Sequence, residues 1–79
     1  MLKKEDLKVG EQIINHTKYP GSGESDWINQ SVGQVLTIIK VSGYRVELDW
    51  PGSCFHFPCN YSNDAELVNS VIDSYYSIL

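Results

Sequence analysis

Alternating apolar and polar positions in the middle of the chain give the clearest structural signal. From Val35 to Val41 both alternating rows are mostly apolar, so we expect a strand that is buried on both faces. Ser42–Gly43 then provides a two-residue link typical of a β-hairpin. Residues 44–50 alternate between an apolar row and a charged row, which predicts a strand with one buried face. The apolar row consists of Tyr44, Val46, Leu48 and Trp50.

Further strands are expected on either side of this hairpin. Pro51–Gly52 forms a turn, because proline fixes φ and glycine accepts a positive φ, and a third strand follows over residues 53–57. Pro58 ends this strand or marks a sheet edge, since proline cannot donate a hydrogen bond to a neighbouring strand. Nearer the N-terminus, a turn at residues 8–10 leads into a strand over residues 11–17. Together these elements predict an antiparallel meander.

A long polar segment from Tyr19 to Trp27 is predicted to be a loop, because it is rich in glycine, serine and proline. A loop of this length in a small domain is usually functional or mobile. Trp27 either packs back onto the core, where burial of an aromatic ring stabilises a small domain by about 2 kcal/mol, or offers its ring to a partner.

The C-terminal part of the chain fits two interpretations. We expect a closing strand at about residues 66–68 and an amphipathic helix over about residues 69–78. The alternative is a single helix from Asp64, because Asn63 and Glu66 have the spacing of a capping box. In either case the apolar face of the helix must be covered by the rest of the domain or by a second copy of the chain. The candidate contacts of such a homodimer are Val68, Val71, Ile72, Tyr75, Tyr76 and Leu79.

Length and composition limit the class of protein. The chain has 79 residues, which suffices for one domain, and 42% of them are hydrophobic, so the chain is not disordered as a whole. No apolar run approaches the ~20 residues of a membrane-spanning helix, and the first residues lack the apolar stretch of a signal peptide. We therefore expect no membrane association and a cytoplasmic location, which is the host cytoplasm if a phage encodes the protein.

The net charge of −4 is unevenly distributed along the chain. Residues 1–45 contain six bases and five acids, which gives +1, whereas residues 46–79 contain five acids and no base, which gives −5. Acidic residues keep a small domain in solution. They also repel a phosphate backbone and suit a basic protein surface, so we expect another protein as the partner rather than a nucleic acid.

Four parts of the chain resemble the strands of small SH3-like barrels. Residues 7–13 resemble the "Leu-x-x-Gly-x-x-Val" first strand, and residues 32–38 are similar to the "Gly-x-Val-x-x-Ile" second strand. Residues 44–50 look like the third strand of KOW-type and Mib/Herc2-like domains. Phe57–Pro58 and Glu66–Val68 resemble the short helical turn and the closing strand.

This resemblance implies an all-β fold, a small five-stranded SH3-like antiparallel barrel over residues 1–68 with a short C-terminal helical tail over residues 69–79. It also implies a non-catalytic binding module rather than an enzyme. Small proteins of this kind are frequent in bacterial and phage genomes, so one expected role is that of a phage or mobile-element accessory protein that inhibits or redirects a host protein. Family members with a KOW-like barrel often contact RNA, ribosomal protein or polymerase.

The resemblance further implies a binding groove between the long first loop and the neighbouring turns, lined by aromatic side chains. Aromatic side chains dominate binding hot spots, and carboxylates around them would suit Lys or Arg on a partner. Trp50 has the alternative of belonging to the core with the apolar row of its strand. The predicted partner-binding residues are Tyr19, Glu24, Asp26, Trp27, Asp49, Trp50 and Tyr61.

A second hypothesis is nucleic-acid binding by the N-terminal lysines together with the aromatic side chains. Such binding would weaken steeply with salt, because displaced counterions drive it. The acidic balance of the chain argues against it. The lysines concerned are Lys3, Lys4, Lys8 and Lys18.

A third hypothesis is a metal- or thiol-dependent domain built on Cys54, His56 and Cys59, with His16 as a fourth ligand. The spacing differs from the Cys-x-x-Cys pairs of structural zinc sites, so we predict no metal and no cofactor. We expect two reduced thiols, because nothing in the sequence indicates an oxidising compartment. Thiol catalysis would also require an oriented base and an oxyanion site, so no catalytic residue is predicted.

Overall fold

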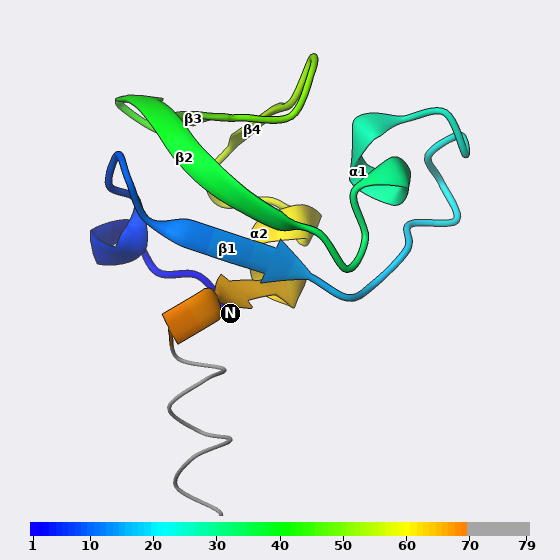
Figure 1. Cartoon of the computed structure of the whole chain (residues 1–79), viewed down its shortest axis with the longest axis horizontal. Coiled ribbons are helices and arrows are strands. Elements are labelled where there is room, and N and C mark those ends of the chain that lie inside the picture. Colours follow the sequence, from blue (N-terminus) through cyan, green and yellow to red (C-terminus); the bar gives the residue numbers. More distant parts are fainter. Residues whose placement is uncertain (70–79) are drawn as a thin grey trace, which may run out of the picture.

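The computed structural model describes residues 1–69 and contains one antiparallel sheet of five strands in the order β4-β3-β2-β1-β5 (Figure 1). The strands are β1 (Gln12–Asn15), β2 (Val35–Ser42), β3 (Arg45–Leu48), β4 (Cys54–His56) and β5 (Ala65–Leu67). This confirms the expected mostly-β fold with five antiparallel strands. The sheet curls into a half-barrel and not a closed barrel, because the edge strands β4 and β5 do not pair with each other within the described residues.

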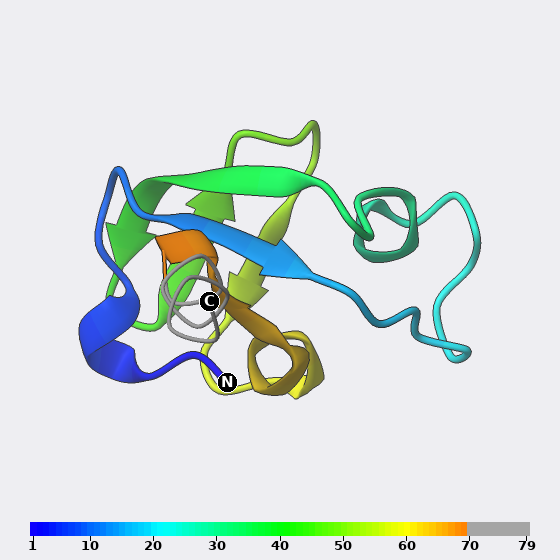
Figure 2. The same ribbon diagram turned by 60° about the horizontal axis from the view of Figure 1, so that its bottom comes forward.

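Three short helical segments accompany the sheet. They are the 3-10 helix η1 (Lys4–Asp6), α1 (Trp27–Gln30) and α2 (Asn60–Asp64). Figures 1 and 2 both place η1 at one end of the sheet and α1, with the long segment that precedes it, at the other end. The segment predicted as a loop therefore ends in one helical turn that begins at Trp27. None of the helices in residues 1–69 is long and apolar enough to span a membrane.

The β2–β3 hairpin turns one residue later than the sequence predicts. Ser42 pairs with Arg45, so the loop consists of Gly43 and Tyr44. Gly43 has φ of 61° and Tyr44 has a negative φ, which is the pattern of a type II′ turn. Tyr44 consequently leaves the apolar row of β3 and is 62% exposed, which corrects its assignment to the core.

An irregularity in β2 corrects the expectation that this strand is buried on both faces. The register with β3 shifts between Ile38 and Lys40, as at a β-bulge. Ile38 lies in the core, whereas Ile39 is 54% exposed and Val35, at the start of the strand, is 48% exposed. Because the half-barrel is a single layer, no second element among residues 1–69 covers the outer face of β2.

The core lies inside the curl of the sheet, where α2 and the N-terminal segment close it (Figure 2). Alternate residues of the strands point inward, as period-two patterning requires. The N-terminus is tied to α2 by a backbone hydrogen bond of 2.9 Å from the Leu2 amide to the Ser62 carbonyl. The buried apolar residues are Leu2, Leu7, Ile13, Leu36, Ile38, Val46, Leu48, Phe55, Tyr61 and Ala65.

The closing strand predicted at residues 66–68 is confirmed one position earlier, as β5. A single helix from Asp64 is excluded, because α2 ends there and Ala65 has extended φ and ψ of −80° and 153°. Helical backbone resumes at residues 68–69, and Val68 is half-buried. Most of the predicted helical tail and of its homodimer contacts lies outside the described residues, namely Val71, Ile72, Tyr75, Tyr76 and Leu79.

Candidate functional site

The long segment before α1 is organised around one side chain, Asn29. Its Oδ1 accepts a hydrogen bond of 2.8 Å from the Tyr19 amide, and its Nδ2 donates to the Tyr19, Ser22 and Gly23 carbonyls at 3.0, 3.1 and 3.2 Å. Asparagine side chains substitute for backbone groups in turns, and here one amide group satisfies four backbone groups. The sequence analysis did not identify Asn29. An asparagine six residues after a glycine is nevertheless a candidate for a side chain that binds the backbone of a loop.

Trp27 packs back onto the core, as the first of the two sequence interpretations has it. Its ring lies 5.0 Å from the ring of Tyr61, and the ring of Tyr61 lies 5.1 Å from that of Phe55. Tyr61 is only 2% exposed. Tyr61 is therefore part of the core and its side chain is not accessible to a partner, which corrects its assignment to a binding groove.

Two further predicted site residues have structural contacts near α1 and α2. The Tyr19 hydroxyl donates a hydrogen bond of 2.7 Å to Asp64 Oδ2, and the half-buried ring packs against the core. Asp26 is the N-cap residue of α1, where its side chain accepts from the Ile28 amide at 3.3 Å. Glu24 is exposed. Tyr19 and Asp26 thus have structural contacts at either end of the segment before α1.

An open groove of about 500 Å³ lies instead beside the turn between β3 and β4, over the outer face of β2 and β3. It contains two of the seven predicted partner-binding residues, Asp49 and Trp50. Trp50 is half-buried and packs against the core, as the core alternative expects in part, and its role in binding a partner stays a prediction. The other residues of interest in the lining are Ile39, Glu47, Pro51 and Cys54.

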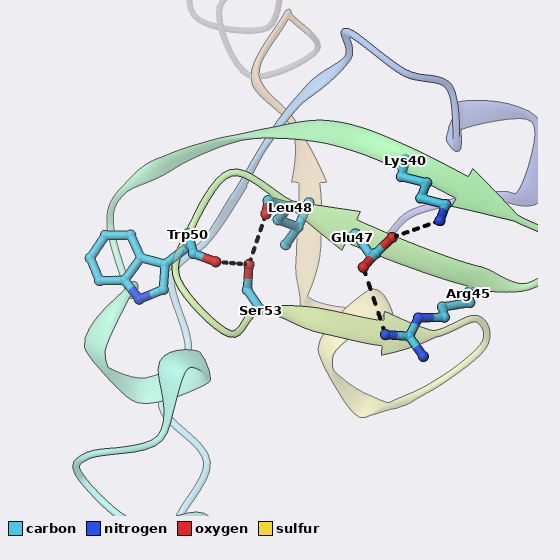
Figure 3. A network of polar contacts seen from close by, with 6 residues as sticks. All are labelled: Lys40, Arg45, Glu47, Leu48, Trp50 and Ser53. Atoms are coloured by element: carbon cyan, nitrogen blue, oxygen red, sulfur yellow. Dashed lines mark hydrogen bonds and ion pairs between the residues drawn. The ribbon is translucent and has the colours of Figure 1, made fainter.

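Ser53 holds the turn that carries Trp50 (Figure 3). Its hydroxyl lies 2.5 Å from the Trp50 carbonyl and 3.2 Å from the Leu48 carbonyl, and its amide donates to the Trp50 carbonyl at 3.0 Å. Ser53 is 6% exposed, and a buried hydroxyl requires such partners. The turn is thus a fixed support for the indole. Sequence reasoning recognised the Pro-Gly turn but missed the serine that closes it.

A second set of bonds ties the same turn to β2. The Thr37 amide donates to Asp49 Oδ1 at 2.8 Å, and the Asp49 amide donates to the Thr37 carbonyl at 3.0 Å. Asp49 is an exposed residue, and its second carboxylate oxygen makes no hydrogen bond or ion pair within residues 1–69. Asp49 therefore combines a structural bond with an accessible negative charge.

The opposite end of the groove carries paired charges. Glu47 lies between two bases, with its carboxylate oxygens 3.8 Å from Lys40 Nζ and 3.7 Å from an Arg45 guanidinium nitrogen (Figure 3). These are surface contacts and add little to stability. The charged residues in the lining itself are Arg45, Glu47 and Asp49, which leaves one net negative charge.

The lysines of the nucleic-acid hypothesis do not form one surface. Lys4 Nζ donates to the Gly43 carbonyl at 2.6 Å and lies 4.8 Å from the centre of the Tyr44 ring, so it supports the β2–β3 hairpin. Lys18 belongs to the segment between β1 and α1, at the other end of the sheet from η1. An electrostatic footprint for nucleic acid needs clustered bases, and Lys18 lies apart from the other three.

The Cys54, His56 and Cys59 set is likewise not assembled into a metal site. Both cysteines are free thiols. Within residues 1–69 no group of three or more His, Cys, Asp or Glu side chains is arranged to hold a metal ion. His16, the suggested fourth ligand, lies 3.9 Å from Glu66 on the surface.

Comparisons of the chain with protein-family models, with curated proteins and with solved structures give no match. The small curled sheet of five antiparallel strands is consistent with an SH3-like barrel. Because a fold of this kind hosts many functions, the function has to be argued from the groove beside the β3–β4 turn.

Stability is expected to fall under alkaline conditions. Burial raises the pKa of the Tyr61 hydroxyl, and the charge of a Cys59 thiolate would add to this; burial and the hydrogen bond to Asp64 raise the pKa of Tyr19. A tyrosine whose folded pKa is raised contributes stability fully below its unfolded pKa of about 10. This contribution to the free energy of unfolding decreases as pH rises from about 10 toward and through the raised pKa of the folded state. For Tyr61 the decrease is up to about 1.4 kcal/mol per pH unit.

Urea denaturation followed by circular dichroism between about pH 8 and about pH 11.5 checks this pH dependence. The variant Tyr61→Phe is the control, because it removes one titrating hydroxyl and leaves lysines and thiols unchanged. We expect a smaller alkaline loss for the variant than for the wild type. Parallel pH curves for the two proteins would contradict the assignment to Tyr61.

Proposed function

We propose that this protein is a non-catalytic module that binds a basic segment of another protein through the groove beside the β3–β4 turn. The observation that carries the proposal is the composition of that groove. It brings together Trp50, the 54% exposed side chain of Ile39 and the exposed residue Asp49 at a turn fixed by Ser53. Rigid aromatic side chains beside apolar and charged groups are typical of binding hot spots.

The charge of the groove favours Lys or Arg on the partner. Glu47 is already paired with Lys40 and Arg45, so the Asp49 carboxylate, which makes no ion pair within residues 1–69, is the group that suits a basic partner. The sequence from residue 46 onward contains five acids and no base. A cation also gains free energy over the face of an indole ring such as that of Trp50. Opposite charges at the rim would speed the encounter and select the partner.

The chemistry of the lining supports binding rather than catalysis. Its one thiol, that of Cys54, shares a face of β4 with His56, but no hydrogen bond orients the imidazole toward the thiol within residues 1–69. A thiol nucleophile needs an oriented base. In the biological part of the proposal, the module inhibits or redirects a host protein as a phage or mobile-element accessory protein, a role that its small size and its acidic charge support.

Selection from a display library of random octapeptides tests the proposed function. We expect enrichment of peptides rich in Lys or Arg, and at least about tenfold weaker binding of those peptides by Trp50→Ala. The matched control is Tyr44→Ala, which removes an exposed aromatic side chain from another hairpin turn and should bind as the wild type does.

Two results would overturn the proposed function. One is enrichment without a preference for basic peptides, or an equal loss of binding in the Trp50 and Tyr44 variants. The other is tight binding of single-stranded RNA that weakens steeply with salt and is unaffected by Trp50→Ala, because this would favour the nucleic-acid hypothesis.

A further inference from the structure

β4 is an edge strand of the sheet, and its hydrogen bonds to β3 follow a fixed alternation. The Phe57 amide donates to the Tyr44 carbonyl at 2.8 Å, and the Leu48 amide donates to the Ser53 carbonyl at 3.3 Å. In an antiparallel ladder the hydrogen-bonded pairs recur at every second residue. Residues 53, 55 and 57 therefore direct their backbone groups toward β3.

The same alternation directs the backbone groups of Cys54 and His56 away from β3. Cys54 is opposite Glu47 and His56 is opposite Arg45 in the register, and both pairs fall between the hydrogen-bonded pairs. No strand pairs with the other side of β4 within residues 1–69. Two N–H and two C=O groups are thus aligned at this edge, where they form a template for one more strand.

The free edge of β4 adjoins the candidate groove. Cys54 belongs to the edge strand and also lines the groove, next to Glu47 on β3. In an antiparallel pair, residues that face each other project their side chains to the same face of the sheet. A residue that bonds to Cys54 or His56 from a neighbouring strand would therefore project its side chain onto the outer face, toward the groove.

We propose that the basic segment binds as an additional antiparallel strand on the free edge of β4, with its Lys or Arg side chains over the groove; this rests on the proposed function. The added strand would lie about 10 Å, two strand spacings, from β3. A long basic side chain and the Glu47 side chain together span this distance. The Asp49 carboxylate and the Trp50 ring are the next contacts along the groove.

The charges favour a foreign basic segment over a second copy of this chain at the edge. If β4 paired with β4 of a second copy, the outward side chains at the contact would be Cys54 and His56. Neither is a lysine or an arginine, so the Asp49 carboxylate, which makes no ion pair within residues 1–69, would remain without a basic partner. A segment with Lys or Arg at alternate positions satisfies both the backbone groups and this carboxylate.

The test uses an acetylated and amidated octapeptide of alternating Lys and Val, titrated into ¹⁵N-labelled protein. We expect amide shifts at Cys54 and His56. N-methylation of the lysine amides should weaken binding at least about tenfold, because those N–H groups would face β4. N-methylation of the valine amides should have little effect, because their N–H groups would face away. An alternating Glu and Val peptide should not bind.

Variants of the protein test the added strand independently of the methylated peptides. His56→Pro removes one outward N–H and should weaken binding of the Lys-Val peptide at least about tenfold, whereas His56→Ala should bind as the wild type does. Proline is tolerated at an edge position whose N–H faces solvent. If the proline variant does not fold, as judged by circular dichroism, the N-methylated peptides still decide the question.

Several results would overturn the added strand. Equal binding of all the methylated peptides would do so, as would failure of the Lys-Val peptide to bind the wild type. A wild type that is dimeric in light scattering, together with a monomeric proline variant, would assign the edge to a second copy. If only Trp50→Ala weakens binding, the groove remains the binding site and the added strand is wrong.

Discussion

Replacement of Tyr61 by alanine is expected to destabilise the protein by about 3–5 kcal/mol. Tyr61 is 2% exposed and contacts the rings of both Trp27 and Phe55, so the truncation leaves a cavity among aromatic side chains. The total free energy of unfolding of a small domain is about 5–15 kcal/mol. We therefore expect a large shift of the urea midpoint, followed by tryptophan fluorescence and circular dichroism, or loss of the folded state.

The matched variant Tyr61→Phe should not lower the free energy of unfolding. The Tyr61 hydroxyl is buried and makes no hydrogen bond within the described residues. A buried polar group without a partner costs about 1–3 kcal/mol, so phenylalanine, which keeps the ring, should be neutral or stabilising. If Tyr61→Phe proved as damaging as Tyr61→Ala, the hydroxyl and not the ring would be the stabilising group.

Replacement of Asn29 by alanine is expected to cost about 2–3 kcal/mol and to open the segment before α1. The variant removes four hydrogen bonds to the backbone of Tyr19, Ser22 and Gly23. Amide hydrogen exchange should report the change most directly, through loss of protection at the Tyr19 amide. Urea denaturation supplies the change in the free energy of unfolding.

Two controls define the role of Asn29. Gln30→Ala changes the adjacent exposed residue of α1 and should have an effect below about 0.5 kcal/mol. Asn29→Asp keeps the acceptor for the Tyr19 amide but loses the donor to three carbonyls, so its effect should approach that of alanine. Wild-type protection of the Tyr19 amide in Asn29→Ala would show that other contacts hold the segment.

The strands were predictable where local signals agree. Alternation and the Pro-Gly turn indicated the β2–β3–β4 meander, because side chains of a half-buried strand repeat every two residues. The hairpin loop was predicted one residue too early, at Ser42–Gly43 instead of Gly43–Tyr44. Both positions fit a glycine-containing turn, and only pairing across the two strands distinguishes them. The shift at Ile38 and Lys40 in β2 was missed for the same reason.

The candidate site was predictable only in part. Asp49 and Trp50 were predicted at the end of a strand, whereas β3 ends at Leu48 and both residues belong to the turn that follows and line the groove. Tyr61 was placed with them because a tyrosine near a predicted loop suggests exposure, but α2 turns its side chain into the core. Asn29 holds the segment before α1, and Ser53 holds the β3–β4 turn. Both side chains bind backbone groups, and such contacts do not depend on the type of the partner residue, so a sequence pattern does not reveal them.

The sequence by itself determined the number of the strands, their order along the chain and the acidic balance, because these depend on composition and on neighbouring positions. The tertiary structure decided which side chains share a surface. It buried Tyr61 against Trp27, left Ile39 exposed and placed Trp50 beside Asp49 on a turn held by Ser53. Within residues 1–69 it also left the sheet open at β4, because edges and grooves arise from pairing between segments that are distant along the chain.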